Sequence, residues 1–133
     1  MKVKVTPSKV HGNVKIPASK SMAHRALICA SLSDGTSLVS NVTNSKDIEA
    51  TVGCMKALGA IIKQIDETTY EVTGTNLFKQ EGNITCNANE SGSTLRFLIP
   101  LAACTNAKVK FLGQGRLLQR PMDVYANEFK EQN

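Results

Sequence analysis

Residues 20–32 read KSMAHRALICASL, and the helix that they predict decides the fold. Apolar residues lie almost all round this helix rather than along one stripe, which is typical of a helix enclosed by other elements. Ser19 is a suitable N-cap, and the turn residues 33–35 predict the end of the helix. A second stretch of the same kind, residues 91–104, reads SGSTLRFLIPLAAC. We therefore expect both helices to be buried.

The sequence around these two helices repeats. The tripeptide Gly12-Asn13-Val14 recurs as Gly82-Asn83-Ile84, an offset of 70 residues, and Ser21 corresponds to Ser91 at the same offset. Self-similarity at a fixed period is the signature of repeated structural units. We therefore expect two related units, over residues 12–81 and 82–133, after an N-terminal strand within residues 1–11.

The expected elements follow from periodicity and capping residues. The N-terminal strand covers residues 1–6, where Lys and Val alternate. The first unit is β-α-β-α-β-β, with strands over 12–17, 36–42, 61–65 and 69–73 and helices over 20–32 and 46–58. The second unit is β-α-β-α, with strands over 84–86 and 108–112 and helices over 91–104 and 121–131. Because its terminal hairpin is missing, we expect the chain to be truncated within the second unit.

Composition excludes several classes of protein. The chain has 133 residues, of which 41% are hydrophobic and 20% charged, as in one soluble domain or part of one. No window approaches the roughly 20 apolar residues of a membrane span, and the N-terminus lacks the apolar core of a secretory signal. Four cysteines without a CxxC pair suit neither a zinc site nor a disulfide scaffold, so we expect reduced thiols and a cytoplasmic protein. They are Cys29, Cys54, Cys86 and Cys104.

The net charge of +5 favours anionic ligands. Proteins that grip single-stranded nucleic acid usually add aromatic stacking platforms, but this chain has two Tyr, four Phe and no Trp. The basic residues are also spread along the sequence. We therefore expect small anionic ligands, and neither nucleic acid nor membrane as a partner.

Residues 19–25, SKSMAHR, form the first candidate site. Free N–H groups and the positive end of the dipole make a helix N-terminus an anion site. Ser21 and Arg25 lie four residues apart and so share one face, and Lys20 adds a charge at the same end. The same residues would also suit an ordinary capped helix with two solvated bases.

Two further segments have a similar character. Residues 89–96, NESGSTLR, begin the second apolar helix, where Gly92 lets a ligand approach the backbone and Arg96 lies one turn on. Residues 113–121, GQGRLLQRP, form a glycine-containing loop that ends on Arg120 and a proline suited to a first helical turn. A serine-rich N-cap and a surface loop explain these segments equally well when each is taken alone. Their concurrence, each with an arginine, favours a shared anion site.

The strings KSMAHRALICASLSDGTS, NESGSTLRFLIPLA and GRLLQRPM, in this order, resemble the N-terminal part of the 5-enolpyruvylshikimate-3-phosphate synthases. The resemblance runs along all 133 residues. It implies an α/β (α+β) fold of repeated βαβαββ units with buried helices and outer sheets, in which residues 1–11 belong with a second domain. It also implies transfer of the enolpyruvyl group of phosphoenolpyruvate to the 5-hydroxyl of shikimate 3-phosphate, without a metal or an organic cofactor.

The resemblance also assigns roles to individual residues. Lys20 would contact both substrates, and Ser21 and Arg25 would hold shikimate 3-phosphate. Gly92 and Arg120 would bind phosphoenolpyruvate. Asp47 and Arg96 are candidates for supporting the site, although a carboxylate near a helix N-terminus also favours the dipole.

Glu90 departs from the family pattern. Many members have Asn-Ala-Gly-Thr where this chain has Glu90-Ser91-Gly92-Ser93, and a carboxylate beside an anion site could repel substrate. The related transferase that acts on UDP-N-acetylglucosamine is an alternative, but its first motif usually reads Lys-Asn where this chain has Lys20-Ser21. It also uses a reactive loop cysteine, whereas Cys29, Cys54 and Cys104 suit small apolar positions in helices.

A third alternative is a non-catalytic fragment that binds anions. No catalytic residue is evident for the proton transfers that the reaction needs, and His24, inside the first apolar helix, is expected to be a packed or surface residue. We therefore expect the chain alone to be inactive. We also expect it to self-associate through helix faces that the truncation exposes.

Overall fold

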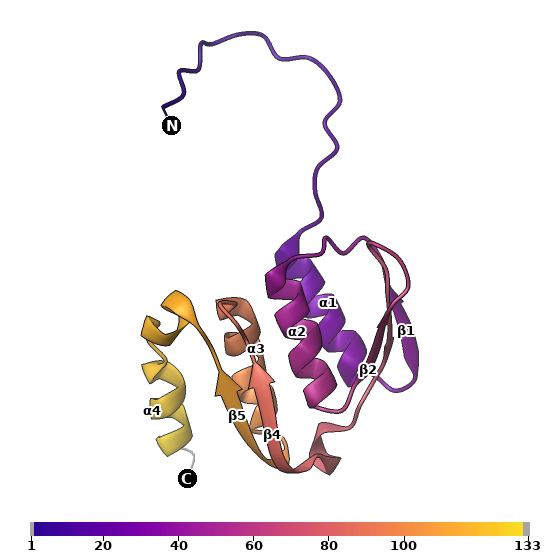
Figure 1. Cartoon of the computed structure of the whole chain (residues 1–133), viewed down its shortest axis with the longest axis vertical. Coiled ribbons are helices and arrows are strands. Elements are labelled where there is room, and N and C mark those ends of the chain that lie inside the picture. The colour runs from indigo at the N-terminus through magenta and orange to yellow at the C-terminus, as the bar shows by residue number, and fades with distance from the viewer. Residues whose placement is uncertain (1, 132–133) are drawn as a thin grey trace.

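A layer of helices lies between two groups of strands in the computed structural model, which describes residues 2–131 (Figure 1). Helices α1 and α2 pack against a three-stranded sheet on one side and against α3 and β4 on the other. The elements in order are α1 Lys20–Leu32, β1 Thr36–Val39, α2 Lys46–Ala57, β2 Ile61–Gln64, β3 Tyr70–Thr73, a 3-10 helix Leu77–Lys79, β4 Glu81–Asn87, α3 Gly92–Ala102, β5 Asn106–Leu112, a 3-10 helix η2 Gly115–Gln119 and α4 Asp123–Glu131. The mixed α/β fold expected from the sequence is confirmed.

The three-stranded sheet has the order β1-β3-β2, and β3 is antiparallel to both neighbours. The expected hairpin is confirmed, with Ile61 opposite Thr73. Its turn is held by Asp66, whose carboxylate accepts the backbone N–H of Thr68 at 2.7 Å. Such a side chain-to-backbone bond two residues on is a common way for Asp to fix a turn. The second sheet consists of β4 and β5, which run parallel.

Serine side chains cap the three long helices. Ser19, Ser45 and Ser91 each accept a backbone N–H from the first turn of α1, α2 and α3. These bonds satisfy donors that have no partner within the helix. In its capping role Ser91 therefore matches Ser19, and not Ser21 as the 70-residue offset suggested. Gly59, at φ 99°, lets the chain turn after α2.

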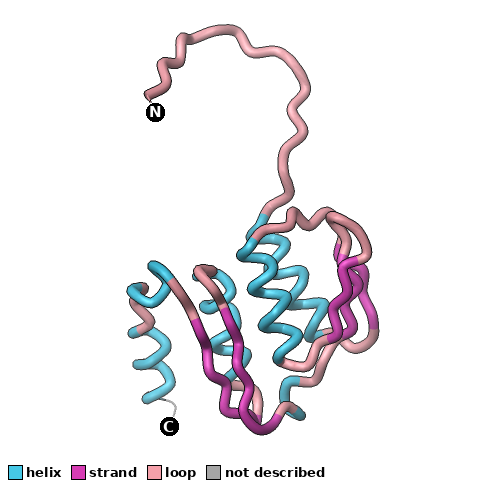
Figure 2. The backbone as a smooth tube through the Cα atoms, in the orientation of Figure 1, coloured by secondary structure: helices cyan, strands magenta, loops and turns pink. Residues whose placement is uncertain are grey.

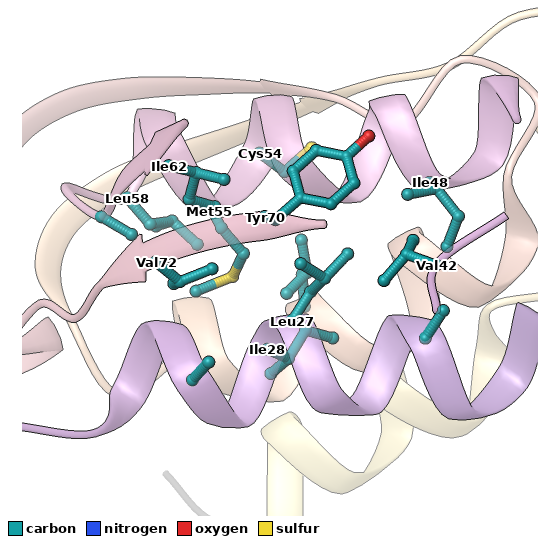
Figure 3. Packing of buried hydrophobic residues seen from close by; sticks show 14 of the residues in the cluster. Leu27, Ile28, Val42, Ile48, Cys54, Met55, Leu58, Ile62, Tyr70 and Val72 are labelled. Atoms are coloured by element: carbon teal, nitrogen blue, oxygen red, sulfur yellow. The ribbon is translucent and has the colours of Figure 1, made fainter. Parts of the chain in front are cut away.

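The core lies between α1, α2 and the three-stranded sheet (Figure 3). Leu27, Ile48, Met55 and Val72 are completely buried there. Burying a side chain of this size contributes about 1.5–3 kcal/mol relative to leaving it exposed. The expectation of an enclosed first helix holds only in part, because Met22 of α1 is 62% exposed.

A proline in α3 helps to attach α4. Pro100 has no N–H, so the carbonyl of Arg96, four residues earlier, loses its helical partner. The hydroxyl of Tyr125 on α4 donates to that carbonyl at 3.0 Å. Tyr125 also lies beside Phe129, with ring centroids 6.4 Å apart.

The expected strands over residues 1–6 and 12–17 are wrong for the part of the chain that the structure describes. Residues 2–19 form no strand and extend away from the rest of the molecule (Figures 1 and 2). A strand is stable only when a neighbouring strand pairs with its backbone, and no described strand pairs with this segment. Its apolar residues are 73–91% exposed, namely Val3, Val5, Val10, Val14 and Ile16.

Other boundaries shift by smaller amounts. The strand expected over 36–42 ends at Val39, because Asn41 takes a left-handed conformation with φ 57°. The strands expected over 84–86 and 108–112 are longer, since their parallel pairing runs from Glu81 opposite Asn106 to Asn87 opposite Leu112. The two 3-10 helices were not expected, and residues 132–133 lie outside the described residues.

Candidate functional site

The N-terminal ends of α1, α2 and α3 meet at one end of the helix layer (Figure 1). The ammonium group of Lys20, the first residue of α1, lies 3.4 Å from the carboxylate of Asp47 in the first turn of α2. The hydroxyl of Thr94, in the first turn of α3, donates to the backbone carbonyl of Asp47 at 3.3 Å. Three positive helix ends are thereby brought together.

The Lys20–Asp47 ion pair is accessible to solvent, with side-chain exposures of 56% and 41%. Such a pair contributes only about 0–1 kcal/mol to stability, because water and salt screen it. An incoming anion can therefore compete with Asp47 for the ammonium group. The structure leaves Lys20 available for binding.

Arg25 bridges α1 and α3. Its guanidinium donates to the carbonyl of Ser21 at 3.2 Å and lies 5.3 Å from the centroid of the Phe97 ring. A guanidinium over an aromatic face is held by a cation–π attraction. The side chains of Ser21 and Arg25 are exposed at the same end of α1 as Lys20.

Arg120 lies directly against Gly92. A Cβ at residue 92 would overlap Nη1 of Arg120 and would stand 3.1 Å from its Cζ. Arg120 follows η2 directly. Through its contact with Gly92, it adds a full positive charge to the positive end of α3. The Arg120 guanidinium and the N-terminus of α3 are both positive and lie in contact, so they favour an anion between or beside them.

Glu90 points toward Gly115, the first residue of η2. A Cβ at Gly115 would overlap its carboxylate. Glu90 also lines a cleft of about 540 Å³, whose other lining residues are Lys46, Asp47, Glu49, Asn89 and Gln114. The cleft's three carboxylates outnumber its one cation, Lys46, and make it a poor place for an anion. Lys20, Arg25 and Arg120 do not line it.

A buried chain of polar side chains crosses the three helices below this surface. Nδ1 of His24 lies 2.7 Å from the hydroxyl oxygen of Thr51, which lies 2.7 Å from that of Thr94. Thr94 continues to the hydroxyl of Ser91 at 2.7 Å. All four side chains are at most 3% exposed. From the sequence, His24 is expected to be a packed or surface residue, and the structure shows that it is packed. The hydrogen-bond chain was not expected, because its members lie on three separate helices.

Burial lowers the pKa of His24 below its ordinary value of 6.5. The carboxylate of Asp47 acts in the opposite direction, while Lys20 and Arg25 add to the lowering. Desolvation disfavours the imidazolium form. His24 is therefore neutral at pH 7, and it is a structural partner of Thr51 rather than an accessible base.

Arg96 is not drawn into this cluster. Its carbonyl accepts the Tyr125 hydroxyl, and its guanidinium is exposed without an ion pair to another described residue. Because Arg96 follows Gly92 by four residues, it lies on the same face of α3 as Gly92.

The cysteines fall into two classes. Cys54 and Cys86 are buried and adjacent, with the Cys86 thiol 3.8 Å from the carbonyl oxygen of Cys54. The contact with Cys86 and burial both raise the pKa of the Cys54 thiol. Cys29 and Cys104 are exposed, so the interpretation of these two as small apolar packing residues is wrong.

Within residues 2–131, the structure brings together no group of three or more His, Cys, Asp or Glu side chains that could hold a metal ion. No helix in this part of the chain is long and apolar enough to cross a membrane.

Comparison with known proteins identifies the family. A model described as EPSP synthase (3-phosphoshikimate 1-carboxyvinyltransferase) matches residues 4–133. A 3-phosphoshikimate 1-carboxyvinyltransferase of Clostridium perfringens (strain SM101 / Type A) is 51% identical over 131 residues, which cover 98% of this chain and 31% of that protein. The protein of the same name from Clostridioides difficile (strain 630) is 46% identical over 142 residues, covering 98% of this chain and 32% of that protein.

The fold is also found among solved structures. An EPSP synthase from Acinetobacter baumannii aligns with a TM-score of 0.78 at 20% identity, over 90% of this chain and 27% of that chain. At this identity the likeness supports the fold alone. The chain spans less than a third of the length of these curated relatives. Because the family model matches the sequence from residue 4 to its last residue, this chain belongs to the EPSP synthase (3-phosphoshikimate 1-carboxyvinyltransferase) family.

Proposed function

We propose that this chain supplies substrate-binding groups for enolpyruvyl transfer from phosphoenolpyruvate to shikimate 3-phosphate, a step of aromatic amino-acid biosynthesis in the cytoplasm. In the net reaction the 5-hydroxyl oxygen bonds to C2 of phosphoenolpyruvate, and the bond from C2 to the phosphate oxygen breaks. The hydroxyl proton ends on the released phosphate. No metal or organic cofactor enters this balance.

The contact between Arg120 and Gly92 carries the proposal. It places a planar guanidinium fork at the N-terminus of α3, where the free backbone N–H groups also point. A fork of this kind matches the oxygens of a phosphate or carboxylate. Phosphoenolpyruvate has both groups on a small frame, so it suits a site that combines Arg120 with a helix terminus.

Shikimate 3-phosphate is assigned to the α1 side. Arg25 supplies a second guanidinium, held between the Ser21 carbonyl and the Phe97 ring. Lys20 starts the same helix and is linked through Asp47 to α2, so it lies between the two binding regions. Asp47 supports the orientation of Lys20, and Arg96 extends the positive face of α3.

We also propose that the chain by itself binds substrates without turning them over. The reaction needs a proton donor to the methylene carbon and a base for the attacking hydroxyl. His24, whose imidazole would suit such a role, is buried and bonded to Thr51. Exposed charge contacts at helix ends contribute about 0.3–1 kcal/mol each, so we expect affinities of about millimolar.

Two titrations of the 15N-labelled chain test the assignment. Phosphoenolpyruvate should shift the amides of Gly92 and its neighbours, and shikimate 3-phosphate those near Ser21. The Arg120→Ala variant should weaken phosphoenolpyruvate more than shikimate 3-phosphate, and the Arg25→Ala variant should do the reverse. Equal losses for both ligands in both variants would contradict the assignment, and phosphate release by the purified chain would contradict the proposed inactivity.

A further inference from the structure

The Thr94 hydroxyl decides the direction of the buried hydrogen-bond chain formed by His24, Thr51, Thr94 and Ser91. The four contacts of this hydrogen-bond chain are His24–Thr51, Thr51–Thr94 and Thr94–Ser91, each 2.7 Å, and Thr94 to the Asp47 carbonyl at 3.3 Å. Each contact needs one proton, and each hydroxyl has one to donate. Thr94 donates to Ser91 or to the Asp47 carbonyl, so its one proton is not available for Thr51. The Thr51 hydroxyl therefore donates to Thr94, and the proton between His24 and Thr51 must come from Nδ1 of His24.

One direction of donation follows along these side chains. The His24 Nδ1–H donates to Thr51, whose hydroxyl donates to Thr94. The Thr94 hydroxyl donates its one proton to the Ser91 oxygen at 2.7 Å or to the Asp47 carbonyl at 3.3 Å. The Ser91 oxygen remains free to accept the backbone N–H of Thr94 at 3.2 Å, which is the N-cap bond of α3.

This hydrogen-bond chain connects the residues that form the proposed anion site. His24 lies one turn after Lys20 on α1, Thr51 lies one turn after Asp47 on α2, and Ser91 directly precedes Gly92. Buried hydroxyls lose their water, so each must find a protein partner, and only a limited range of helix positions allows all of them to do so. We propose that His24 is a positioning residue: as an Nδ1–H donor it completes a buried hydrogen-bond chain that fixes the first turns of α1, α2 and α3 at the spacing needed by the anion site.

The first test needs no ligand. 15N NMR of the wild-type imidazole should show a protonated Nδ1 and an unprotonated Nε2 at pH 7, because the hydrogen bond fixes the tautomer. A proton on Nε2 instead would overturn the proposal. Thr51→Val should abolish this preference, whereas Thr51→Ser should restore it.

The second test measures positioning directly. In Thr51→Val, the amides of Ala23 in α1 and Leu95 in α3 should exchange with solvent about tenfold faster than in wild type, because the first turns open more often. The matched control is Thr73→Val, which removes a threonine pair on the outer sheet, where Thr73 lies 2.9 Å from Thr36. Equal exchange rates in wild type and Thr51→Val would overturn the positioning role.

The third test rests on the proposed function. Inorganic phosphate should bind Thr51→Val about fivefold more weakly than wild type, while Thr51→Ser and Thr73→Val bind within a factor of about two. His24→Asn, whose amide nitrogen occupies the place of Nδ1, should bind better than His24→Leu. A folded Thr51→Val with wild-type affinity would overturn the link to the site. If wild-type protein binds no phosphate, the proposed function fails, and the tautomer and exchange measurements still decide the positioning role.

Discussion

The guanidinium of Arg120 occupies the place that a Cβ at residue 92 would take, so a side chain there would have to displace it. The contact joins the end of η2 to the start of α3, two elements separated along the chain by β5. It concentrates positive charge where the helix already has unpaired N–H groups. Glycine at residue 92 therefore leaves room for the Arg120 guanidinium, and its own backbone conformation does not require it.

The substitution Gly92→Ala should separate binding from stability. The new methyl would push Arg120 aside, so phosphate should bind about tenfold more weakly, a change of about 1.4 kcal/mol. Stability should be kept or rise by up to about 1 kcal/mol, because alanine is the better helix former. The control is Gly53→Ala in α2, where a Cβ meets nothing within 4 Å. Gly53→Ala should stabilise the protein without changing its affinity for phosphate. If Gly92→Ala binds phosphate as tightly as wild type, the contact between Arg120 and Gly92 has no role in binding.

Lys20→Ala should lower anion affinity with little effect on folding. Its ion pair with Asp47 is exposed, so the loss of stability should stay below about 1 kcal/mol. Lys63→Ala is a matched control, because Lys63 forms a comparable 3.7 Å pair with Glu71 on the three-stranded sheet. Calorimetric titration with phosphate should show weaker binding for Lys20→Ala alone. Equal affinities for the two variants would remove Lys20 from the site.

Stability should fall as the pH drops below 6.5. Burial lowers the pKa of His24 in the folded state, whereas in the unfolded state it keeps its ordinary value of 6.5. Near and below pH 6.5 the unfolded state therefore binds more protons than the folded state. The stability contributed by neutral His24 is complete above pH 6.5 and is lost as the pH falls below it. Urea denaturation between pH 5 and pH 8 should show this slope in wild type and a weaker one in His24→Asn. An equal slope in both proteins would exclude His24 as its source.

The pKa of Asp66 acts in a different range. The backbone N–H of Thr68 is the main cause that lowers the pKa of Asp66 below 3.8. A carboxyl with a lowered pKa loses its stabilising effect only as the pH falls below its ordinary value, so it does not contribute to the slope near pH 6.

The cysteines should react in two groups. Cys29 and Cys104 are exposed and should be alkylated within minutes by iodoacetamide under native conditions. Cys54 and Cys86 are completely buried, so both should react only after unfolding, although their contact raises the pKa of Cys54 and lowers that of Cys86. Mass spectrometry of peptides after a short pulse would check this, and early labelling of Cys54 would contradict the packing of α2 against β4.

Self-association is expected through the N-terminal segment. The most exposed large apolar side chains of the described residues, at 73–91%, lie in residues 2–19. Helix α1 exposes Met22 and Leu32, and α3 has no large apolar side chain in this exposed class. An extended segment with alternating Val and Lys can add to the edge of a neighbour's sheet. Light scattering should show a mass that rises with concentration. Val14→Lys with Ile16→Lys should reduce it, whereas Val124→Lys on α4 should not, and a wild-type monomer at high concentration would contradict the expectation.

The sequence by itself determined the helices, the hairpin and the candidate binding segments. Their signals act between neighbouring residues: a serine caps the helix that follows it, and Asp66 holds a turn two residues long. The 70-residue offset likewise indicated a second unit, although the helix caps correct its register to Ser19 and Ser91.

Tertiary structure decided how these segments meet. The bond between Thr51 and Thr94 joins residues 43 positions apart, and no local pattern distinguishes these threonines from exposed ones such as Thr43. The contact of Arg120 with Gly92 depends in the same way on the packing of η2 against α3. Residues 2–19 show that a local pattern alone can fail. Their alternating residues favour a strand, but no described strand pairs with them, and hydrogen bonds to a neighbouring strand are what stabilise one.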